Sequence, residues 1–341
     1  MNTLLSVRDL KQHFRLGGGF LRKHYTVYAV DGISFDLKQG ETLGLVGESG
    51  CGKSTLGRSL LKLFEPTAGT ISFEGRDITK LSTREMRSLR QEMQMVFQDP
   101  AESLNSRHTV GQILEEPFII HGKGDSQQRR EWVLALLDKV GLPKSAVDRY
   151  PHEFSGGQRQ RIGIGIGIGI GIARAIALKP KLLVCDEAVS ALDVSVQSQI
   201  VNLLLNLQRE MNLAIIFIAH DLSVVKHISD RIAVMYLGRI VELADAQTLY
   251  LSPRHPYTQA LISAIPVPDP RRRNQRILLT GDVPSPISPP SGCHFHQRCP
   301  HATDLCRNTA PSLQICDGDA HEVACHTPLP VAEAVPLGKA V

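Results

Sequence analysis

The segment "GESGCGKST", residues 47–55, decides the fold of this 341-residue chain. It fits the pattern G-x-x-x-x-G-K-[ST], with the apolar run "TLGLV" before it and the helical stretch "LGRSLLKLF" after it. Glycines allow backbone N–H groups to surround phosphate oxygens, and the start of a helix attracts anions. We therefore predict a phosphate loop rather than a glycine-rich turn without chemical meaning.

Two side chains of this loop have predicted roles in binding a nucleotide such as ATP. Lys53 would reach the β- and γ-phosphates, and the Ser54 hydroxyl would bind Mg²⁺. The loop residues predicted to bind the nucleotide are Gly47, Glu48, Ser49, Gly50, Cys51, Gly52, Lys53, Ser54 and Thr55.

A pair of acids ends the apolar run "LLVCDE" at residues 182–187. Asp186 would complete the Mg²⁺ shell, and Glu187 would polarise a water molecule for attack on the γ-phosphate. An Asp-Glu pair at the end of a strand is weak evidence alone. Paired with the phosphate loop, it predicts that the chain binds a nucleotide.

Short apolar segments alternate with helical ones along the first 250 residues, and this order predicts an α/β domain with a parallel sheet. Residues 195–211 have helical spacing. From residue 251 to residue 341 the chain is rich in proline, so we expect a small, loop-rich C-terminal domain there. The predicted strands lie at residues 28–37, 42–46, 70–75, 181–187 and 214–220.

The composition favours a globular protein, with 42% hydrophobic and 21% charged residues. There is no apolar run of 18 residues and no apolar core of a signal peptide, so we expect a cytoplasmic protein. The net charge of +4 is dispersed, and the three arginines at 271–273 are interpreted as solvated. We expect no nucleic-acid partner.

Five of the seven cysteines lie in the last fifty residues, and in a reducing compartment such clusters favour metal ligation over disulfides. Cys293, Cys299, Cys306 and Cys325 are spaced more loosely than the paired C-x-x-C of a zinc ribbon, and all-thiolate ligation of a [4Fe-4S] cluster tolerates such spacing. Cys316 is off this pattern. A cluster, a zinc ion and plain reduced thiols remain alternatives.

Further motifs resemble those of ABC-type ATPases. The segment "FSGGQRQR" resembles the family's signature motif, with Phe154 where leucine is commoner. Gln98 in "VFQDP" resembles the Q-loop residue, "SALD" ending at Asp193 the D-loop, and His220 in "IAHD" the switch histidine. With the phosphate loop and the acid pair, six motifs occur in the family's order across roughly residues 4–250.

The resemblance implies a RecA-like core with a P-loop, an antiparallel β subdomain and a helical subdomain at about residues 98–160. It also implies a dimer that sandwiches two ATP molecules head to tail. Glu187 would be the general base, His220 would contact the γ-phosphate, and Gln98 would sense Mg²⁺ and the attacking water. The residues that would face the ATP bound on the partner are Ser155, Gly156, Gly157 and Gln158.

An aromatic side chain that stacks on adenine usually precedes the phosphate loop in this family. Tyr25 is the predicted residue, and Tyr28 and His24 are alternatives. Ala188 stands where the family usually has proline, which would loosen the turn after Glu187 without removing a catalytic group.

The C-terminal segments "HPYTQAL" (255–261) and "GDVPSPISPPSGCHFHQRCP" (281–300) resemble the extension of peptide-importer ATPases, which also have relatives for nickel and glutathione. The chain is most similar to the second, F-type ATPase subunit of a dipeptide permease. This branch resembles proteins in which such cysteines hold an iron–sulfur cluster. The implied partners are a second, homologous ATPase subunit, two membrane permeases and, indirectly, an extracytoplasmic peptide-binding protein. The implied location is peripheral, at the cytoplasmic face of the inner membrane.

Five Gly-Ile pairs occupy residues 163–172, where the family has a single pair, so eight residues are surplus. If these eight residues were helical, they would lengthen the helix by about 12 Å and rotate the part that follows by about 80°, which would turn "ARAIAL" away from its sheet. Their four glycines would also cost about 4 kcal/mol relative to alanine. As a strand or a loop they would expose isoleucines. We interpret the repeat as a tandem expansion, with a regulatory insert as the alternative.

The leading prediction is a Mg-ATP-hydrolysing subunit that powers import of di- or oligopeptides. The first alternative is a catalytically impaired structural subunit, because the repeat follows the signature directly. The second is a soluble ABC ATPase of DNA repair or translation, against which the "HPY" extension and the single nucleotide site both count.

Overall fold

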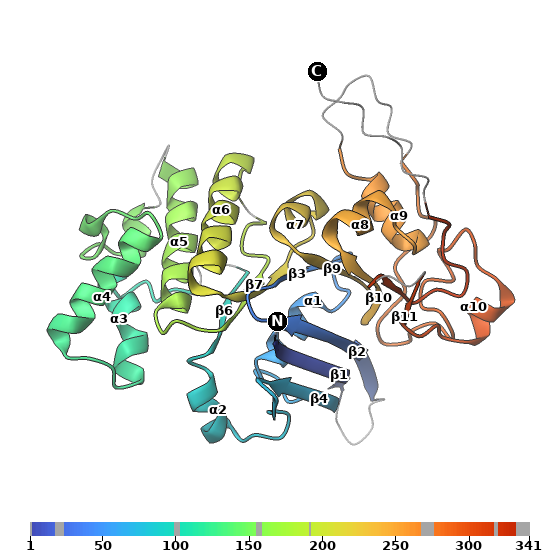
Figure 1. Ribbon diagram of the computed structural model, residues 1–341, viewed down its shortest axis with the longest axis horizontal. Helices are drawn as coiled ribbons and strands as arrows, with labels where there is room; N and C mark the ends of the chain where they lie inside the picture. The colour runs from blue at the N-terminus through green and yellow to red at the C-terminus, as the bar shows by residue number, and fades with distance from the viewer. Residues whose placement is uncertain are drawn as a thin grey trace. The chain divides into compact units, whose positions relative to one another are not determined.

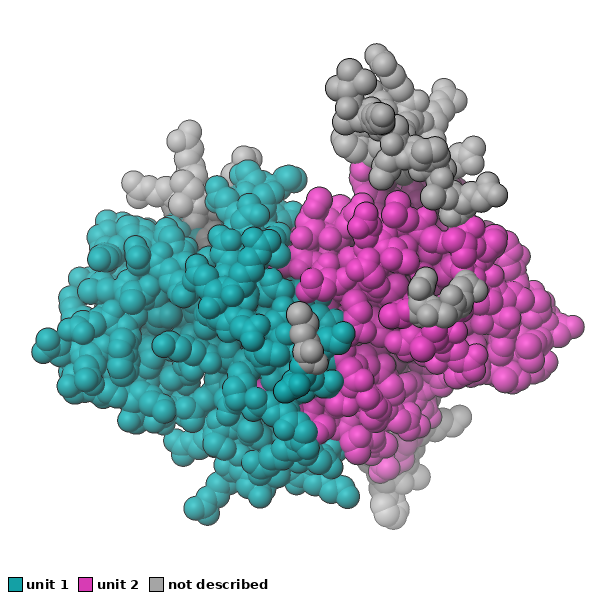
Figure 2. Space-filling model, in the orientation of Figure 1, with its two compact units in different colours: residues 1–5, 37–42, 74–219 teal, residues 6–36, 43–73, 220–341 magenta. Residues whose placement is uncertain are grey.

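The structure is a computed structural model of the chain, and its backbone divides into two compact units, which Figure 2 colours separately. Unit 1 comprises residues 1–5, 37–42 and 74–219, and unit 2 comprises residues 6–36, 43–73 and 220–341. The residues that the structure describes are 2–17, 24–98, 103–154, 159–190, 192–266, 276–316 and 320–331.

Unit 1 has a parallel sheet in which β7 (Leu182–Asp186) pairs with both β6 (Met93–Val96) and β8 (Ala214–Ile218). All five residues of β7 and of β8 are buried, as expected for central parallel strands. The strands predicted at 181–187 and 214–220 are confirmed, whereas β6 was not predicted. The other elements of this unit are β5 (Arg76–Asp77), α2 (Thr83–Leu89), α3 (Val110–Ile120), α4 (Ser126–Lys139), η1 (Lys144–Ala146), η2 (Pro151–Phe154), α5 (Arg159–Ile176) and α6 (Val194–Met211).

Helix α6 confirms the helical spacing predicted at 195–211. The Asp193 carboxylate accepts hydrogen bonds from the N–H groups of Ser195 and Val196, which caps the first turn. Four apolar residues at helical intervals are buried, and Asn212 ends the helix in the left-handed conformation. In Figure 1, helices α3, α4 and α5 of this unit lie beside one another.

The Gly-Ile repeat forms part of the continuous helix α5. Ile168, Ile170 and Ile172 are buried, as are Ala173 and Ile176 of the "ARAIAL" segment. The expectation that a helical repeat would turn this segment away from the sheet is therefore wrong. Helix α5 packs against α3, α4, α6 and β6, so it is enclosed on several sides, and a helix that is apolar all round is stable in such a place.

Gly169 offers a test of this helical repeat. A Cβ added there would meet only side-chain atoms of Leu142, at 3.5 Å or more, which is ordinary van der Waals contact. We expect Gly169→Ala to raise the free energy of unfolding by about 1 kcal/mol, because alanine has the higher helix propensity. The check is urea unfolding followed by circular dichroism.

The matched control for this prediction is Gly111→Ala in α3. A Cβ at Gly111 would lie 2.9 Å from the backbone oxygen of Val147, so this variant should lose about 1–3 kcal/mol through overpacking. A Gly169→Ala protein that unfolds at lower urea than the parent would contradict the helical assignment of the repeat.

Unit 2 contains two groups of strands. Most of β1 (Thr3–Leu16) lies here between β2 (Tyr25–Lys38) and β4 (Ala68–Phe73). The second group pairs β3 (Thr42–Val46) in parallel with β9 (Arg231–Tyr236). The strands predicted at 28–37, 42–46 and 70–75 are thereby confirmed. The other elements are α1 (Lys53–Leu60), α7 (Leu222–Ile228), β10 (Arg239–Asp245), α8 (Ala246–Leu251), α9 (Pro256–Ser263), α10 (Asp304–Asn308), β11 (Gln314–Ile315) and β12 (Glu322–Val323).

The C-terminal part of the chain extends the strand pairing of unit 2. Strand β9 forms an antiparallel hairpin with β10, which pairs in turn with β12, and β12 pairs with β11. Buried residues of β9 and β10 and of the segment after residue 290 thus form one core. Among the described helices, none combines the length and the apolar character needed to span a membrane.

Candidate functional site

The phosphate loop joins β3 to α1, and its glycines adopt conformations that other residues rarely take. Gly47 has a φ of 152° and Gly52 a φ of 104°. A Cβ at Gly47 would lie 2.2 Å from the carbonyl oxygen of Met235, and one at Gly52 would lie 2.0 Å from that of Ala29. The loop therefore needs glycine at both positions because neighbouring backbone leaves no room.

The Lys53 side chain is folded into the loop. Its ammonium group donates hydrogen bonds of 2.8 Å and 3.0 Å to the carbonyl oxygens of Gly47 and Glu48. Lys53 is only 4% exposed, although it carries a charge. Such a buried cation, at the first turn of a helix, lies where the loop can present it to an anion. Ser54 follows it in that turn and is partly exposed.

The acid pair lies at the carboxyl end of β7 in unit 1. Asp186 is fully buried, and Glu187 is partly exposed in the left-handed conformation, with a φ of 49°. Gln98 donates a hydrogen bond of 3.0 Å from Nε2 to Oε2 of Glu187. The structure thus brings together two of the predicted catalytic side chains, which are far apart in the sequence.

The turn after Glu187 is held by its own hydrogen bonds, with Ala188 where the resemblance led us to expect proline. The Ser190 hydroxyl and N–H both donate to the Glu187 carbonyl oxygen, at 2.8 Å and 3.2 Å. Ala188 and Val189 are buried. A non-glycine residue at positive φ costs about 1–3 kcal/mol, and such strain clusters at functional sites.

Two other predicted residues lie at the starts of helices. Asp193 caps α6 in unit 1, as described above. His220 is the first residue of the last segment of unit 2, two positions after β8, and it is exposed just before Asp221 caps α7. The predicted signature residues 155–158 lie outside the described part of the chain.

Comparisons with known proteins show what this chain is similar to. Residues 30–190 match the family described as "ABC transporter" and residues 241–306 the "Oligopeptide/dipeptide transporter, C-terminal region". The chain is 53% identical to the oligopeptide transport ATP-binding protein AppF of Bacillus subtilis, over 95% of this chain and 97% of that protein. It belongs to the ABC transporter family.

Two more relatives support this assignment. The chain is 53% identical to the probable peptide ABC transporter ATP-binding protein y4tS of Sinorhizobium fredii, over 98% of this chain and 92% of that protein. The structure of cbiO1 from Clostridium perfringens, part of the ABC transporter complex cbiONQ, is similar with a TM-score of 0.60 and 28% identity, over 73% of this chain and 91% of that one. The predicted fold, an ABC cassette of α/β class, is confirmed, and the chain is an ATPase of this family.

The aromatic residue of this ABC ATPase that would contact adenine stays a prediction. Tyr25 is the first residue of β2 and is 50% exposed. The rival Tyr28 packs edge-on against His13, with ring centroids 4.6 Å apart. Strand β2 runs beside the phosphate loop at Ala29, because a Cβ added at Gly52 would lie only 2.0 Å from the Ala29 carbonyl oxygen.

The four predicted metal-binding cysteines of this ABC ATPase gather in unit 2. Burial raises the pKa of Cys293 to about 11, and the thiols of Cys306, Cys325 and Cys299 add to the rise. All seven cysteines are among the described residues, and none of them forms a disulfide. Within the described residues, however, no three or more Cys, His, Asp or Glu side chains are grouped so that they could hold a metal ion.

Two residues that contact the phosphate loop were missed from the sequence. Arg298 pairs with the Glu48 carboxylate, and the Tyr257 hydroxyl accepts the Glu48 N–H. Arg298 lies 250 positions after Glu48, and no local pattern links the two. The "HPY" motif, which contains Tyr257, and the segment 281–300, which contains Arg298, marked this region as distinctive, but neither linked it to the phosphate loop.

Proposed function

We propose that this ABC ATPase hydrolyses Mg-ATP to power the import of di- or oligopeptides through a membrane transporter. The observation that carries the proposal is the hydrogen bond between Gln98 and Glu187 at the end of β7, since a general base must be held in place to orient water. The match to the oligopeptide/dipeptide C-terminal region supports the class of substrate.

The residues have the following proposed roles. Glu187 accepts a proton from the attacking water, Gln98 orients that water, and His220 contacts the γ-phosphate. Ser54 and Asp186, together with Gln98, supply the oxygen ligands that Mg²⁺ prefers. Bound Mg²⁺ neutralises charge on the phosphates.

The proposed assembly contains a second, homologous ATPase subunit and two permease subunits, and it receives peptide from an extracytoplasmic binding protein. By the proposed arrangement, residues 155–158 of this chain would contact the nucleotide that the partner ATPase holds. The chain then works at the cytoplasmic face of the membrane. The similar protein cbiO1 is itself part of an ABC transporter complex, which supports assembly of this chain into such a complex.

Peptide-stimulated ATPase activity tests this function. The chain is co-expressed with its partner ATPase and permeases, beside a variant that lacks residues 163–170. Because α5 is enclosed and the C-terminal half of this helix is buried, we expect the parent to hydrolyse ATP at a rate within about threefold of that of the shortened variant.

Activity restricted to the shortened variant would favour the alternative of a catalytically impaired subunit. A chain that hydrolyses ATP but does not co-purify with permeases would overturn the transport function. It would favour a soluble ABC ATPase instead.

We also propose that Cys293, Cys299, Cys306 and Cys325 hold a [4Fe-4S] cluster. Burial raises the pKa of Cys293, Cys299 and Cys325, and neighbouring thiols of the group raise it further. Ionising these thiols to bind a metal therefore needs a compensating positive centre. No three such side chains of the described residues are grouped to hold a metal ion, so any metal would have to draw these cysteines together, zinc to about 2.3 Å from a single ion. A four-iron cluster binds each thiolate to a different iron and so accepts wider spacing.

Iron and acid-labile sulfide analysis of anaerobically purified protein tests the cluster. We expect about four irons per chain, and loss of at least half of that iron in Cys299→Ala. Cys316→Ala is the matched control, since Cys316 lies beside β11, where its N–H donates to His321, and this variant should keep its iron. Protein that holds neither iron nor zinc would show that the thiols are simply reduced.

A further inference from the structure

The second residue of the phosphate loop, Glu48, is paired with an arginine of the C-terminal region. Arg298 donates from Nη1 to Oε2 of Glu48 at 2.7 Å and from Nη2 to Oε1 at 3.0 Å. Arg298 is 8% exposed, so the pair is largely shielded from water. Two parallel hydrogen bonds between guanidinium and carboxylate fix both distance and orientation.

The backbone of the same loop residue is held by the "HPY" motif. The Glu48 N–H donates to the Tyr257 hydroxyl at 2.9 Å, and Tyr257 is completely buried in α9. His255 caps this helix, because its Nδ1 accepts the Tyr257 N–H at 3.1 Å. Burial lowers the pKa of His255 to about 4, so its ring stays neutral and able to accept at pH 7.

An aromatic cluster supports both contacts. The rings of Tyr236, Tyr257 and Phe295 pack with centroids 4.8–5.4 Å apart. The Arg298 guanidinium lies 5.9 Å from the centroid of the Tyr236 ring, and its Nη1 donates to the Tyr236 hydroxyl at 3.5 Å. These rings restrict the positions that Arg298 and Tyr257 can take.

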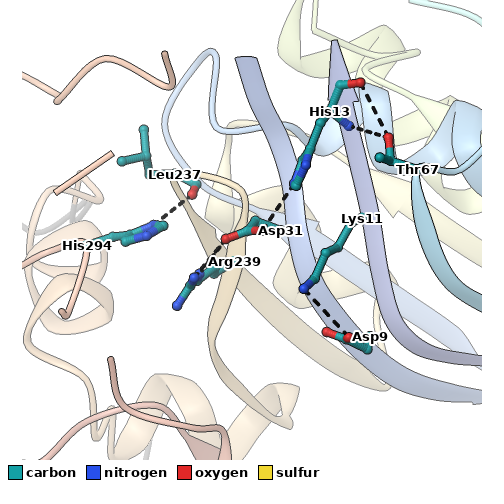
Figure 3. Close-up of polar contacts among 8 residues, drawn as sticks. All are labelled: Asp9, Lys11, His13, Asp31, Thr67, Leu237, Arg239 and His294. Carbon is teal, nitrogen blue, oxygen red and sulfur yellow. Dashed lines mark hydrogen bonds and ion pairs between the residues drawn. The ribbon is translucent and has the colours of Figure 1, made fainter. Parts of the chain in front are cut away.

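A third contact reaches the loop through the β9–β10 hairpin. The Gly238 N–H donates to the Cys51 carbonyl oxygen at 2.9 Å. His294 Nδ1 lies 3.1 Å from the Leu237 carbonyl oxygen, which can only accept, so Nδ1 carries the proton (Figure 3). Figure 3 also shows Asp31 between Arg239 and His13 beside this hairpin.

We propose that the C-terminal region holds the phosphate loop of its own chain in the conformation that binds ATP, and that Arg298 is a positioning residue that neutralises Glu48. An unpaired carboxylate in this loop would repel the phosphates of ATP and, half-buried, would drive the loop to rearrange. The C-terminal region is then part of the nucleotide site as well as a marker of transporter type. This inference rests on the proposed assignment of the loop as the ATP site.

Calorimetric titration of the full chain with Mg-ATP tests the pair. We expect Arg298→Met to raise the Kd for ATP about tenfold, which is the size of effect that follows loss of a shielded charge partner. Glu48→Gln, whose neutral amide needs no cation, is measured as the reference for the double variant. The double variant should bind ATP within about threefold of Glu48→Gln and more tightly than Arg298→Met, because the unpaired charge is gone.

Comparison of Arg298→Met with the double variant tells whether Arg298 acts by neutralising the Glu48 charge or only by packing against its neighbours. A double variant that binds ATP as weakly as Arg298→Met, or more weakly, would overturn the proposal, as would an Arg298→Met protein with the parent's affinity. Arg307→Met is the matched control, since the Arg307 side chain is 64% exposed in the same region. It should bind ATP as the parent does.

Two further variants cover other outcomes. Tyr257→Phe is the variant to use if Arg298→Met does not fold, because it removes only the hydroxyl that accepts the Glu48 N–H. We expect this variant to bind ATP about fivefold more weakly than the parent. Unchanged ATP binding would contradict the role of the "HPY" motif. If Lys53→Ala bound ATP with the parent's affinity, the loop would not be the ATP site, and the proposed function would be overturned as well. Failure of rescue alone would overturn only the positioning role.

Discussion

Glu187→Gln is expected to lower the kcat of ATP hydrolysis about 10³-fold while leaving the Kd for Mg-ATP within about threefold. The amide has nearly the shape of the carboxylate and can still hydrogen-bond Gln98, but it cannot take a proton from water. Steady-state phosphate release by the assembled transporter, together with calorimetric binding of ATP to the isolated chain, measures both quantities.

The control for this variant is Glu210→Gln, which neutralises an exposed carboxylate on α6 that pairs with Lys139 at 2.9 Å. It should keep the parent's kcat. A Glu187→Gln transporter that retains more than about a tenth of the parent's rate would show that another group serves as the base.

Gly52→Ala is expected to weaken ATP binding about 100-fold, equivalent to a loss of about 2.7 kcal/mol. The added Cβ would lie 2.0 Å from the Ala29 carbonyl oxygen, and alanine would have to adopt a φ of 104°. Since the Ala29 oxygen belongs to the backbone and cannot rotate aside, the loop must move away from β2, and its N–H groups then no longer converge on a phosphate. Calorimetric titration with Mg-ATP measures the loss.

A matched variant separates the collision from the backbone strain. Gly75 has a φ of 76°, but a Cβ added there would meet nothing within 4 Å. Gly75→Ala should therefore cost about 1–2 kcal/mol of stability and leave the Kd for ATP unchanged. Equal losses of ATP affinity in the two variants would mean that strain, rather than the contact with Ala29, determines the effect.

Local chemistry explains why much of the candidate site has a pattern in the sequence. Residues 47–55 need glycines, a lysine and a hydroxyl at set positions, because phosphate must meet N–H groups over a few consecutive residues. The strand ending at Asp186 and the helix capped by Asp193 were likewise visible as short patterns. These features depend on neighbours within about one turn of helix or one strand.

The Gly-Ile repeat shows where this kind of prediction failed. Glycine propensity and helical rotation counted against a helix at residues 163–172, yet α5 is continuous and Ile168, Ile170 and Ile172 are buried. A glycine within a helix costs about 1 kcal/mol relative to alanine, whereas burying an isoleucine side chain stabilises the fold by about 1.5–3 kcal/mol. Neighbouring elements on several sides of α5 decide the balance, and the sequence does not show them.

The sequence by itself determined that this chain has a phosphate loop, an acidic strand end and a peptide-importer C-terminal region, since each is written in contiguous residues. Only the tertiary structure decided that Gln98 holds Glu187 and that Arg298 holds Glu48. Hydrogen bonds form between atoms about 3 Å apart in space. Positions separated by 89 or 250 residues meet only when the strands and helices between them have packed.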